Sequence, residues 1–191
     1  PYMASSFLAI SSYMSAAPLN PAYKTNEYEF YLKDLSPKIV IVEPNSKNNV
    51  IEVAKKLKIP VCDIKIQKDS PSGLFDLFEK SSEYSLPEEN DEALVLHTSG
   101  TTSRPKIVPL TNKNIFSSAV NISKSLELSE IDHCLNIMPL FHIHGLIAIL
   151  ATSMKVGASV CASNGFNAIK FLELAKSEKI TWYSGVPTMH Q

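Results

Sequence analysis

The amino-acid sequence predicts an α/β fold of layered, mostly parallel sheets with flanking helices. Short β-branched or apolar runs alternate along the whole chain with longer segments whose apolar residues recur at helical spacing. A strand, a helix and a second strand in succession form a βαβ unit, which requires parallel pairing. No short-period repeat of the kind found in solenoid proteins is present.

The first 66 residues are predicted to hold the clearest βαβ unit. Residues 3–16 are rich in small and apolar side chains, which favours a buried helix. Thr25 is expected to cap a second helix that ends at Ser36. Strands are expected at 39–42 and 59–62. A third helix between them has Ser46 as its expected cap and an apolar face formed by Val50, Val53 and Leu57.

Residues 67–91 are dominated by Ser, Pro, Lys and Glu, so we interpret them as a linking segment. Residues 92–191 resume the alternation, beginning with the apolar run 93–96, typical of a strand buried on both faces. The elements expected after this run are a helix capped by Thr111, a strand at 134–138, a helix at 145–155, a strand at 158–162, a helix capped by Asn167 with Ala168, Leu172 and Ala175 on one side, and a strand at 180–184.

The stretch after the 93–96 run has the chemistry of a polyphosphate site. Thr98 to Arg104 combine several hydroxyl groups with one glycine, and Lys106 follows shortly after. Hydroxyl and backbone N–H donors, a tight turn and fixed cations are what a bound triphosphate needs. The expected order of strand, polar loop and helix would also bring this loop beside a helix N-terminus.

Two other nucleotide-binding motifs do not fit. A Walker A loop ends in Gly-Lys-Ser/Thr, whereas Gly100 is followed only later by Pro105 and Lys106. A dinucleotide-binding fold needs Gly-x-Gly-x-x-Gly after its first strand, and none of the six glycines has that spacing.

The stretch resembles the phosphate-binding signature of the adenylate-forming (AMP-binding) superfamily, which includes acyl-CoA synthetases. That signature reads Thr-Ser-Gly-Thr-Thr-Gly-x-Pro-Lys-Gly. Ser103 stands where glycine is usual, as in the subgroup of oxalate-CoA ligases and peroxisomal CoA synthetases, and Ile107 replaces the closing glycine. A β-branched residue does not readily adopt the positive φ that glycine allows, so the exit from the loop is expected to differ from that of the family.

Pro139-Leu140-Phe141-His142 is similar to the second signature of the same superfamily. The resemblance implies that His142 lies at the mouth of the acyl pocket, near the α-phosphate. His142 and His144 would share a face of a strand and could ligate zinc, but no third ligand is near in sequence. One packed and one exposed histidine, with no metal, is the interpretation that we adopt.

The resemblance implies an ATP-dependent carboxylate-CoA ligase that uses ATP, Mg²⁺ and coenzyme A, and of which this chain is an incomplete part of the N-terminal domain. A carboxylic acid would first form an acyl-adenylate, and CoA would then displace AMP. His142 and Lys106 are the expected catalytic residues. The residues expected to bind the phosphates are Thr98, Ser99, Gly100, Thr101, Thr102, Ser103, Arg104 and Lys106.

The chain lacks the family's Tyr-Gly-x-Thr-Glu string and its C-terminal lysine, so activity of this piece alone is not expected. A non-catalytic nucleotide-binding homologue or remnant stays open as an alternative, favoured by Ile107. The absence of a starting Met and of a basic leader argues for a piece of a longer protein and against a signal peptide.

Composition narrows the function classes further. With 18 Lys and Arg against 19 Asp and Glu, the formal net charge of −1 gives no basic field for nucleic acid. No apolar stretch is long enough to span a membrane. Cys62, Cys134 and Cys161 have no disulfide or metal spacing, which indicates reduced thiols in an intracellular protein, cytoplasmic or peroxisomal.

Overall fold

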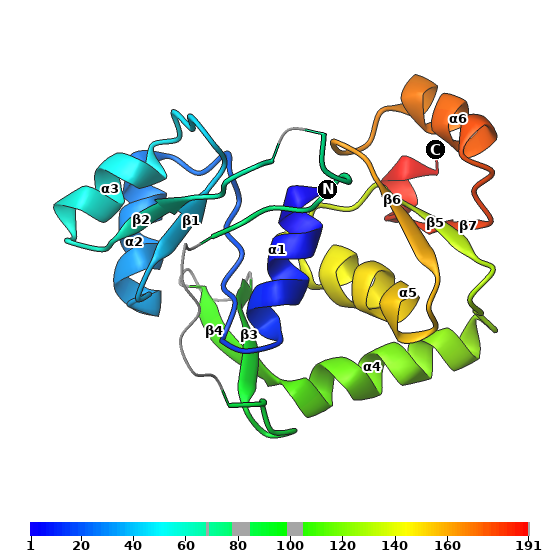
Figure 1. Ribbon diagram of the computed structural model, residues 1–191, viewed down its shortest axis with the longest axis horizontal. Helices are drawn as coiled ribbons and strands as arrows, with labels where there is room; N and C mark the ends of the chain where they lie inside the picture. Colours follow the sequence, from blue (N-terminus) through cyan, green and yellow to red (C-terminus); the bar gives the residue numbers. More distant parts are fainter. Residues whose placement is uncertain (68, 78–84, 99–104, 191) are drawn as a thin grey trace. The chain divides into compact units, whose positions relative to one another are not determined.

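The computed structural model describes residues 1–67, 69–77, 85–98 and 105–190 (Figure 1). It divides into two units. One comprises residues 1, 3–18 and 85–191, and the other comprises residues 2 and 19–84. The strands of the described chain pair in a mostly parallel manner, with helices beside them, which confirms the predicted fold class.

The unit of residues 19–84 contains the predicted βαβ motif. Strand β1 (Val40–Val42) pairs in parallel with β2 (Val61–Asp63), and helix α3 (Val50–Lys56) connects them. Helix α2 (Thr25–Leu35) packs against α3 through a shared apolar cluster. The fully buried members of that cluster are Tyr28, Leu32, Val50, Val53 and Ala54.

Both predicted helix caps in this unit were wrong by one to three residues. Helix α2 has Lys24 as its N-cap, and the carboxylate of Glu27 accepts the Lys24 backbone N–H at 2.8 Å. Helix α3 begins only at Val50, whose N–H donates to Asn48 Oδ1 at 2.9 Å, while the Ser46 hydroxyl lies in the preceding turn. In both cases an acidic or amide side chain beside the predicted cap accepts a backbone N–H at the start of the helix.

Helix α1 (Tyr2–Ser11) is shorter than the predicted helix over 3–16. The Ser12 hydroxyl donates to the carbonyl of Leu8 at 2.7 Å in the last turn. Four residues later Ala16 pairs as an extended residue with strand β3 (Glu92–Thr98), exchanging two backbone hydrogen bonds of 2.8 and 2.9 Å. The chain therefore leaves the helix early in order to join the edge of β3.

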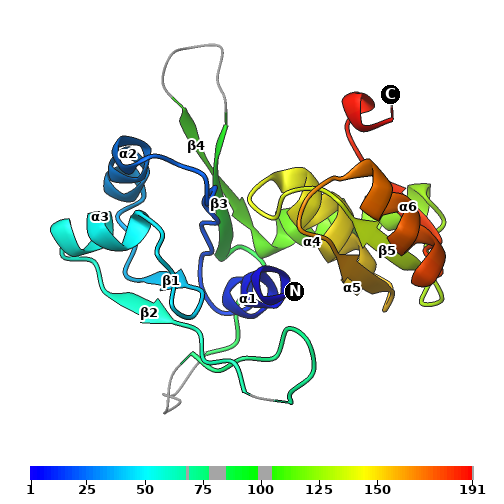
Figure 2. The same ribbon diagram turned by 90° about the horizontal axis from the view of Figure 1, so that it is seen from above.

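Strand β3 pairs with an antiparallel strand that the sequence analysis did not predict, β4 (Lys106–Thr111); Figure 2 shows the two strands side by side. Ala93 and Leu94 are fully buried, whereas the rest of β3 is half-buried or exposed. Helix α4 (Asn112–Ser125) follows β4 directly. Its N-cap is Thr111, as predicted, and the Thr111 hydroxyl accepts the Asn114 N–H at 3.2 Å.

The remaining strands form a parallel sheet in the order β6-β5-β7 within the described chain. Strands β6 (Ser159–Ala162) and β7 (Trp182–Ser184) lie within the predicted runs, and β5 (His133–Asn136) overlaps its predicted run but begins one residue earlier. The chain moves from the central β5 to β6 on one side and then to β7 on the other. Right-handed crossovers in opposite directions put their helices on opposite faces, and Figure 1 shows α5 (Thr152–Lys155) and α6 (Ala168–Ser177) on opposite sides of β6.

The helix expected at 145–155 is present, but most of it is a π-helix, η1 (His144–Ala151), continued by α5. Most of η1 is buried, and the hydroxyls of Thr152 and Ser153 are fully buried at the junction. They donate to the carbonyls of Ile147 at 2.9 Å and Ile149 at 2.8 Å. These bonds satisfy two polar groups that could not otherwise lie in an apolar core. A short 3₁₀-helix, η2 (Pro187–Met189), ends the described chain.

Helix α6 has the predicted cap but not the predicted face. Asn167 Oδ1 accepts the Lys170 N–H at 3.0 Å. Of the three residues expected on the packed side, Ala168 and Leu172 are exposed, Leu172 by 69%, and only Ala175 is half-buried, together with Phe171 and Leu174. Apolar residues cover a wide arc of this helix, opposite Lys170, Glu173 and Ser177, so their spacing did not single out the part of that arc that contacts the sheet. Among the described residues, no helix has both the length and the apolar character needed to cross a bilayer.

Candidate functional site

The two ends of the predicted phosphate-binding stretch are brought together by the β3–β4 pair. Thr98 ends β3, Lys106 begins β4, and the two are register partners with exposed side chains. The other six residues predicted to bind phosphate lie outside the described residues; they are Ser99, Gly100, Thr101, Thr102, Ser103 and Arg104.

The expected order of strand, loop and helix is wrong for this stretch, because β4 separates the loop from α4. Thr111, the cap of α4, pairs with Glu92 at the opposite end of the ladder from Lys106. Five residue steps along an antiparallel strand measure about 17 Å, at about 3.4 Å per residue. The positive field of a helix N-terminus fades within its first turn, so α4 does not extend it to an anion bound beside Lys106.

Ile107 lies inside β4, opposite His97, and not in a tight turn. Its backbone is extended, and a β-branched side chain suits a strand. The side chain is 42% exposed. Ile107 therefore has an ordinary conformation in this structure, and the positive φ that made the substitution puzzling is not required of it here.

His142 lies in the segment that leaves the carboxyl end of β5, and its side chain is exposed. Its backbone N–H donates to the carbonyl of Pro139 at 3.2 Å, which closes a turn. The imidazole ring lies against the ring of Phe141, with centroids 4.6 Å apart. An exposed imidazole on a closed turn is available to a ligand that approaches the end of the sheet.

Two buried residues hold this turn in place. Asn136, only 2% exposed, accepts the Met138 N–H on its Oδ1 at 2.9 Å. Gly145 lies so near the turn that a Cβ added there would be 2.5 Å from the carbonyl oxygen of Pro139. Neither residue was predicted from the sequence to belong to the site. A polar Asn136 within the otherwise apolar run 134–138 was the available signal.

His144 is half-buried, unlike His142, which matches the interpretation of one packed and one exposed histidine. Its Nε2 lies 2.7 Å from the hydroxyl oxygen of Ser184, the last residue of β7. No group of three or more His, Cys, Asp or Glu residues that could hold a metal ion occurs within the described part of the chain. Ser184 had no distinctive signal in the sequence.

The end of β3 at Thr98 and the turn that carries His142 are both anchored in one apolar cluster. Leu94 and Leu146 are buried members of this cluster, and Leu96 and Leu140 pack against it. Leu96 precedes Thr98 by two residues, and Leu140 precedes His142 by the same interval. A common core therefore supports the end of the β3–β4 ladder and the turn that carries His142.

The cysteines do not contribute a nucleophile to this region. All three are free thiols. Burial raises the pKa of the Cys134 thiol to about 12, with a smaller contribution from Cys161. The Cys134 thiol is therefore protonated and inert at neutral pH.

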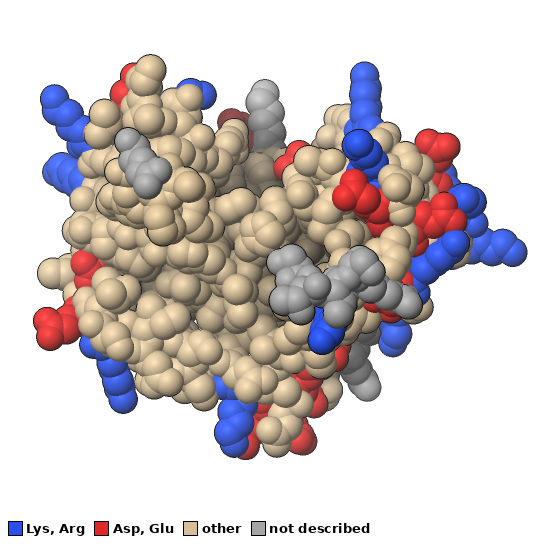
Figure 3. All heavy atoms as spheres, turned by 180° about the vertical axis from the view of Figure 1, so that it is seen from behind, with Lys and Arg blue, Asp and Glu red and all other residues tan. Residues whose placement is uncertain are grey.

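Charged side chains are mixed on the face seen in Figure 3, where lysine and arginine lie among aspartate and glutamate. The coloured residues of that view form no continuous basic patch. On the face seen in this view, positive charge therefore comes from separate side chains and not from one broad patch.

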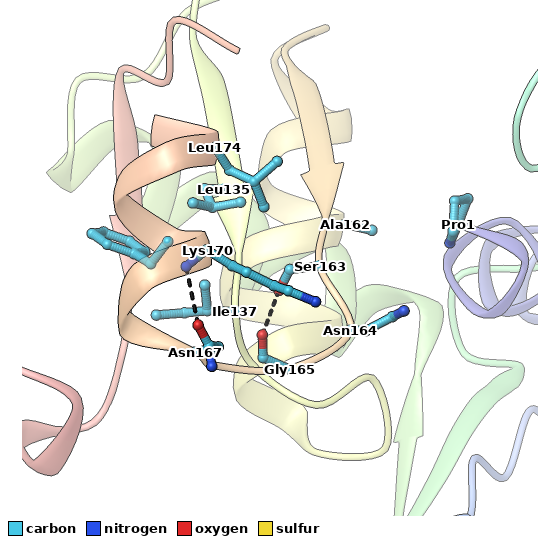
Figure 4. Close-up of a pocket in the computed structure, with 11 residues that line it drawn as sticks. Pro1, Leu135, Ile137, Ala162, Ser163, Asn164, Gly165, Asn167, Lys170 and Leu174 are labelled. Carbon is cyan, nitrogen blue, oxygen red and sulfur yellow. Dashed lines mark hydrogen bonds between the residues drawn. The ribbon is translucent and has the colours of Figure 1, made fainter. Parts of the chain in front are cut away.

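A cavity of about 390 Å³ lies at the carboxyl ends of β5 and β6, beside the first turn of α6. Figure 4 shows Lys170 extending from α6 toward the loop of Ser163 and Gly165, whose hydroxyl and carbonyl are 2.9 Å apart. Ile137 and Phe171 contribute apolar walls. Among the predicted site residues that the structure describes, neither Thr98, Lys106 nor His142 lines this cavity.

Comparison with known proteins identifies the family. The family model described as AMP-binding enzyme matches residues 1–191, so the chain belongs to the AMP-binding enzymes. It is 40% identical over 193 residues to the oxalate–CoA ligase of Arabidopsis thaliana, covering 97% of this chain and 38% of that protein. It is 31% identical to the oxalate–CoA ligase of Saccharomyces cerevisiae, covering 91% of this chain and 37% of that protein.

A solved structure is also similar to this chain. The crystal structure of ATP-bound MatB from Rhodopseudomonas palustris superposes with a TM-score of 0.73 at 26% identity, covering 90% of this chain and 34% of that one. The chain thus spans little more than a third of the length of these relatives. The predicted family is confirmed, and the relatives named here include CoA ligases.

Proposed function

We propose that the chain is part of the N-terminal domain of an ATP-dependent carboxylate–CoA ligase. The observation that carries the proposal is the shared apolar cluster, because Leu96 and Leu140 pack against it and each lies two residues before a predicted site residue. Family membership over residues 1–191 supports it. Within this domain we assign residues 1–66 to a βαβ-containing segment, 67–91 to a linking segment, and 92–191 to the phosphate loop and acyl pocket.

The proposed reaction has two steps. The carboxylate of the acid attacks the α-phosphate of ATP, which forms an acyl-adenylate and releases pyrophosphate. The thiol of CoA then attacks the acyl carbon and releases AMP. Negative charge grows on the departing pyrophosphate in the first step, so donors and a cation fixed in advance accelerate it by positioning and electrostatics.

In this proposal Thr98 and Lys106 contact the β- and γ-phosphates, together with Ser99, Gly100, Thr101, Thr102, Ser103 and Arg104. The ladder that pairs Thr98 with Lys106 supports this role, because it fixes their backbones relative to each other. His142 orients the carboxylate or the adenylate through its exposed imidazole. Mg²⁺ would accompany the ATP, since this ion is usually bound through substrate phosphates, water and one or two carboxylates.

We propose a short dicarboxylic acid of the oxalate type as the acid that is activated. The support is that both curated relatives named above are oxalate–CoA ligases, one of them 40% identical. Such an acid keeps a second carboxylate that does not react, and burying that charge in a purely apolar pocket would be costly. A site with exposed donors such as His142 suits it better.

Acid-dependent ATP–pyrophosphate exchange by the complete ligase tests the proposal. Oxalate, succinate, a fatty acid and an aromatic monocarboxylate are compared at equal concentration. We expect oxalate to give the largest kcat/KM, and we expect the isolated 191-residue chain to be inactive. Exchange with none of the acids would instead support a non-catalytic nucleotide-binding homologue or remnant.

We propose that the ligase works inside the cell, in the cytoplasm or the peroxisome. The three free thiols support a reducing compartment. Imaging of the complete tagged protein beside a peroxisomal marker decides between the two locations, and secretion of the protein would refute both.

A further inference from the structure

We propose that His144 is a positioning residue: its hydrogen bond with Ser184 closes the segment that carries His142 and keeps that segment in place. The effect that we expect His144 to have on catalysis rests on the proposed ligase function. The closure itself is a claim about the structure alone, and amide hydrogen exchange tests it without any assay of activity.

The geometry of the segment is that of a closed loop. The chain leaves β5 at Asn136, whose register partner on β7 is Ser184. It returns at His144, where the imidazole Nε2 is 2.7 Å from the Ser184 hydroxyl oxygen. The end of the loop is therefore tied to the strand residue that lies opposite its beginning.

The other polar contacts of the segment act within itself or with the helix that follows. Asn136 binds the backbone of Met138, and the His142 N–H binds the carbonyl of Pro139. The carbonyl of His142 accepts the Leu146 N–H at 3.1 Å, a backbone contact with the helix η1 that follows directly. Met138 also packs in an apolar cluster with Val186 and Met189, a contact that has no directional preference. The bond between His144 and Ser184 is a directional contact to a different strand, 40 residues away in sequence.

Leu140 anchors this stretch in the apolar cluster, but the His142 ring is exposed, so we infer that its orientation over the sheet depends on the directional contact at His144. The ring contacts Phe141, which belongs to the same segment, so that contact does not fix the segment relative to the sheet. Releasing His144 from Ser184 would let the Pro139–Ile143 stretch shift over the carboxyl end of β7. A shift of about 1 Å is enough to reduce the rate of a reaction that relies on orientation.

The experiment uses the complete ligase with His144→Ala, Ser184→Ala, the double variant, and two variants that keep a polar atom near the same place, His144→Gln and Ser184→Thr. The first measurement is amide hydrogen exchange in the peptide that spans residues 138–146. We expect faster exchange in both alanine variants and near wild-type exchange in His144→Gln and Ser184→Thr. Unchanged exchange in both alanine variants would overturn the closure, whether or not the protein is a ligase.

The second measurement is steady-state ATP–pyrophosphate exchange. Loss of one hydrogen bond predicts a kcat about two- to tenfold lower in each alanine variant, with the KM for ATP within about twofold. The double variant is expected to lose no more than the worse single variant, because one bond is removed in each case. Losses that multiply, or a rise in the KM for ATP without a change in kcat, would refute the positioning role. If His144→Ala does not fold, Ser184→Ala removes the same bond with a smaller change in volume.

A wild-type ligase with no acid-dependent activity would refute the proposed function and with it the catalytic role of His144. The hydrogen-exchange measurement would still decide whether His144 closes the segment.

Discussion

Thr98 and Lys106 are register partners across the β3–β4 ladder, although seven residues separate them in the chain. They form the last described pair before residues 99–104. Their backbone positions are fixed relative to each other by the ladder, independently of the stretch that joins them. A phosphate site built on this pair begins with the backbones of one threonine and one lysine already opposite each other.

Replacing Lys106 with alanine is expected to lower the rate of acyl-adenylate formation. The change removes one charge-assisted hydrogen bond to the departing pyrophosphate, worth about 1.5–3 kcal/mol, or about ten- to a hundredfold in rate. Lys113→Ala is the matched control, since Lys113 lies beyond the far end of β4 and pairs with Glu89 at 3.0 Å. ATP–pyrophosphate exchange measures both variants, and equal rates for the two would exclude Lys106 from the mechanism.

Gly145→Ala is expected to destabilise the protein and to displace the turn that carries His142. The new Cβ would lie 2.5 Å from the carbonyl oxygen of Pro139, and overpacking of this kind costs about 1–3 kcal/mol. Gly185→Ala is the control, because its Cβ would meet its neighbours at an ordinary 3.4 Å. Thermal unfolding compares them, and a Gly145→Ala variant as stable as Gly185→Ala would contradict the close approach.

Thr111→Ala is expected to reduce stability by about 1 kcal/mol, because α4 loses the acceptor for the Asn114 N–H. Thr111→Ser keeps the hydroxyl and is expected to stay near the wild-type value. The unfolding midpoint of each variant gives the comparison. A loss shared equally by both variants would mean that the methyl group, not the cap, carries the effect.

The stability of the βαβ unit is expected to depend on the ionisation of Glu29. Hydrogen bonds from Lys33 at 2.6 Å and Lys56 at 2.9 Å lower the pKa of the Glu29 carboxyl from 4.5 to about 2. A lowered folded-state pKa gives a contribution that is present above pH 4.5 and is lost as the pH falls toward 2. Glu29→Gln lacks this contribution at every pH.

Thermal unfolding of the wild type and of Glu29→Gln from pH 7 to pH 2 tests this expectation. The difference between their Tm values is expected to be constant above pH 4.5 and to shrink below it. Because these ion pairs are partly exposed, 1 M salt is expected to reduce the difference throughout. A difference that grows on acidification would show that the sign is wrong.

The sequence was sufficient for the parts of the fold that depend on strong local signals. The β-branched run at 39–42 and the apolar run at 134–138 predicted strands of parallel sheets, and both are present. Thr111 and Asn167 were identified as helix caps because each stands directly before an apolar-periodic segment. These signals act within a few residues and need no tertiary context.

Strand β4 was missed because its sequence argues against a strand. Pro109 has no N–H to donate, and Lys106 and Thr111 at its ends are polar. In the structure Pro109 faces Val95 in a ladder of two described strands, where a proline N can point away from the partner strand. The error had a consequence for the site, since it placed the loop next to a helix that begins at the other end of the strand.

The arrangement around His142 could be predicted only in part. The signature at 139–142 identified the histidine, but nothing in the eight residues of η1 distinguishes a π-helix from an α-helix. Ser184 lies 40 residues beyond His144, and only the order of strands β6-β5-β7 brings them together. Strand order is set by tertiary packing, which local periodicity does not encode.

Leu110 is anchored in the apolar cluster four residues after Lys106, and this fixes the number of residues that can separate the two. Inserting or deleting a single residue between these two would turn Lys106 toward the opposite side of the ribbon while Leu110 stayed in the interior, since alternate residues of a strand face opposite ways. Exchanges of one side chain for another at 107–109 are therefore expected to be tolerated in evolution far more readily than gaps in that interval.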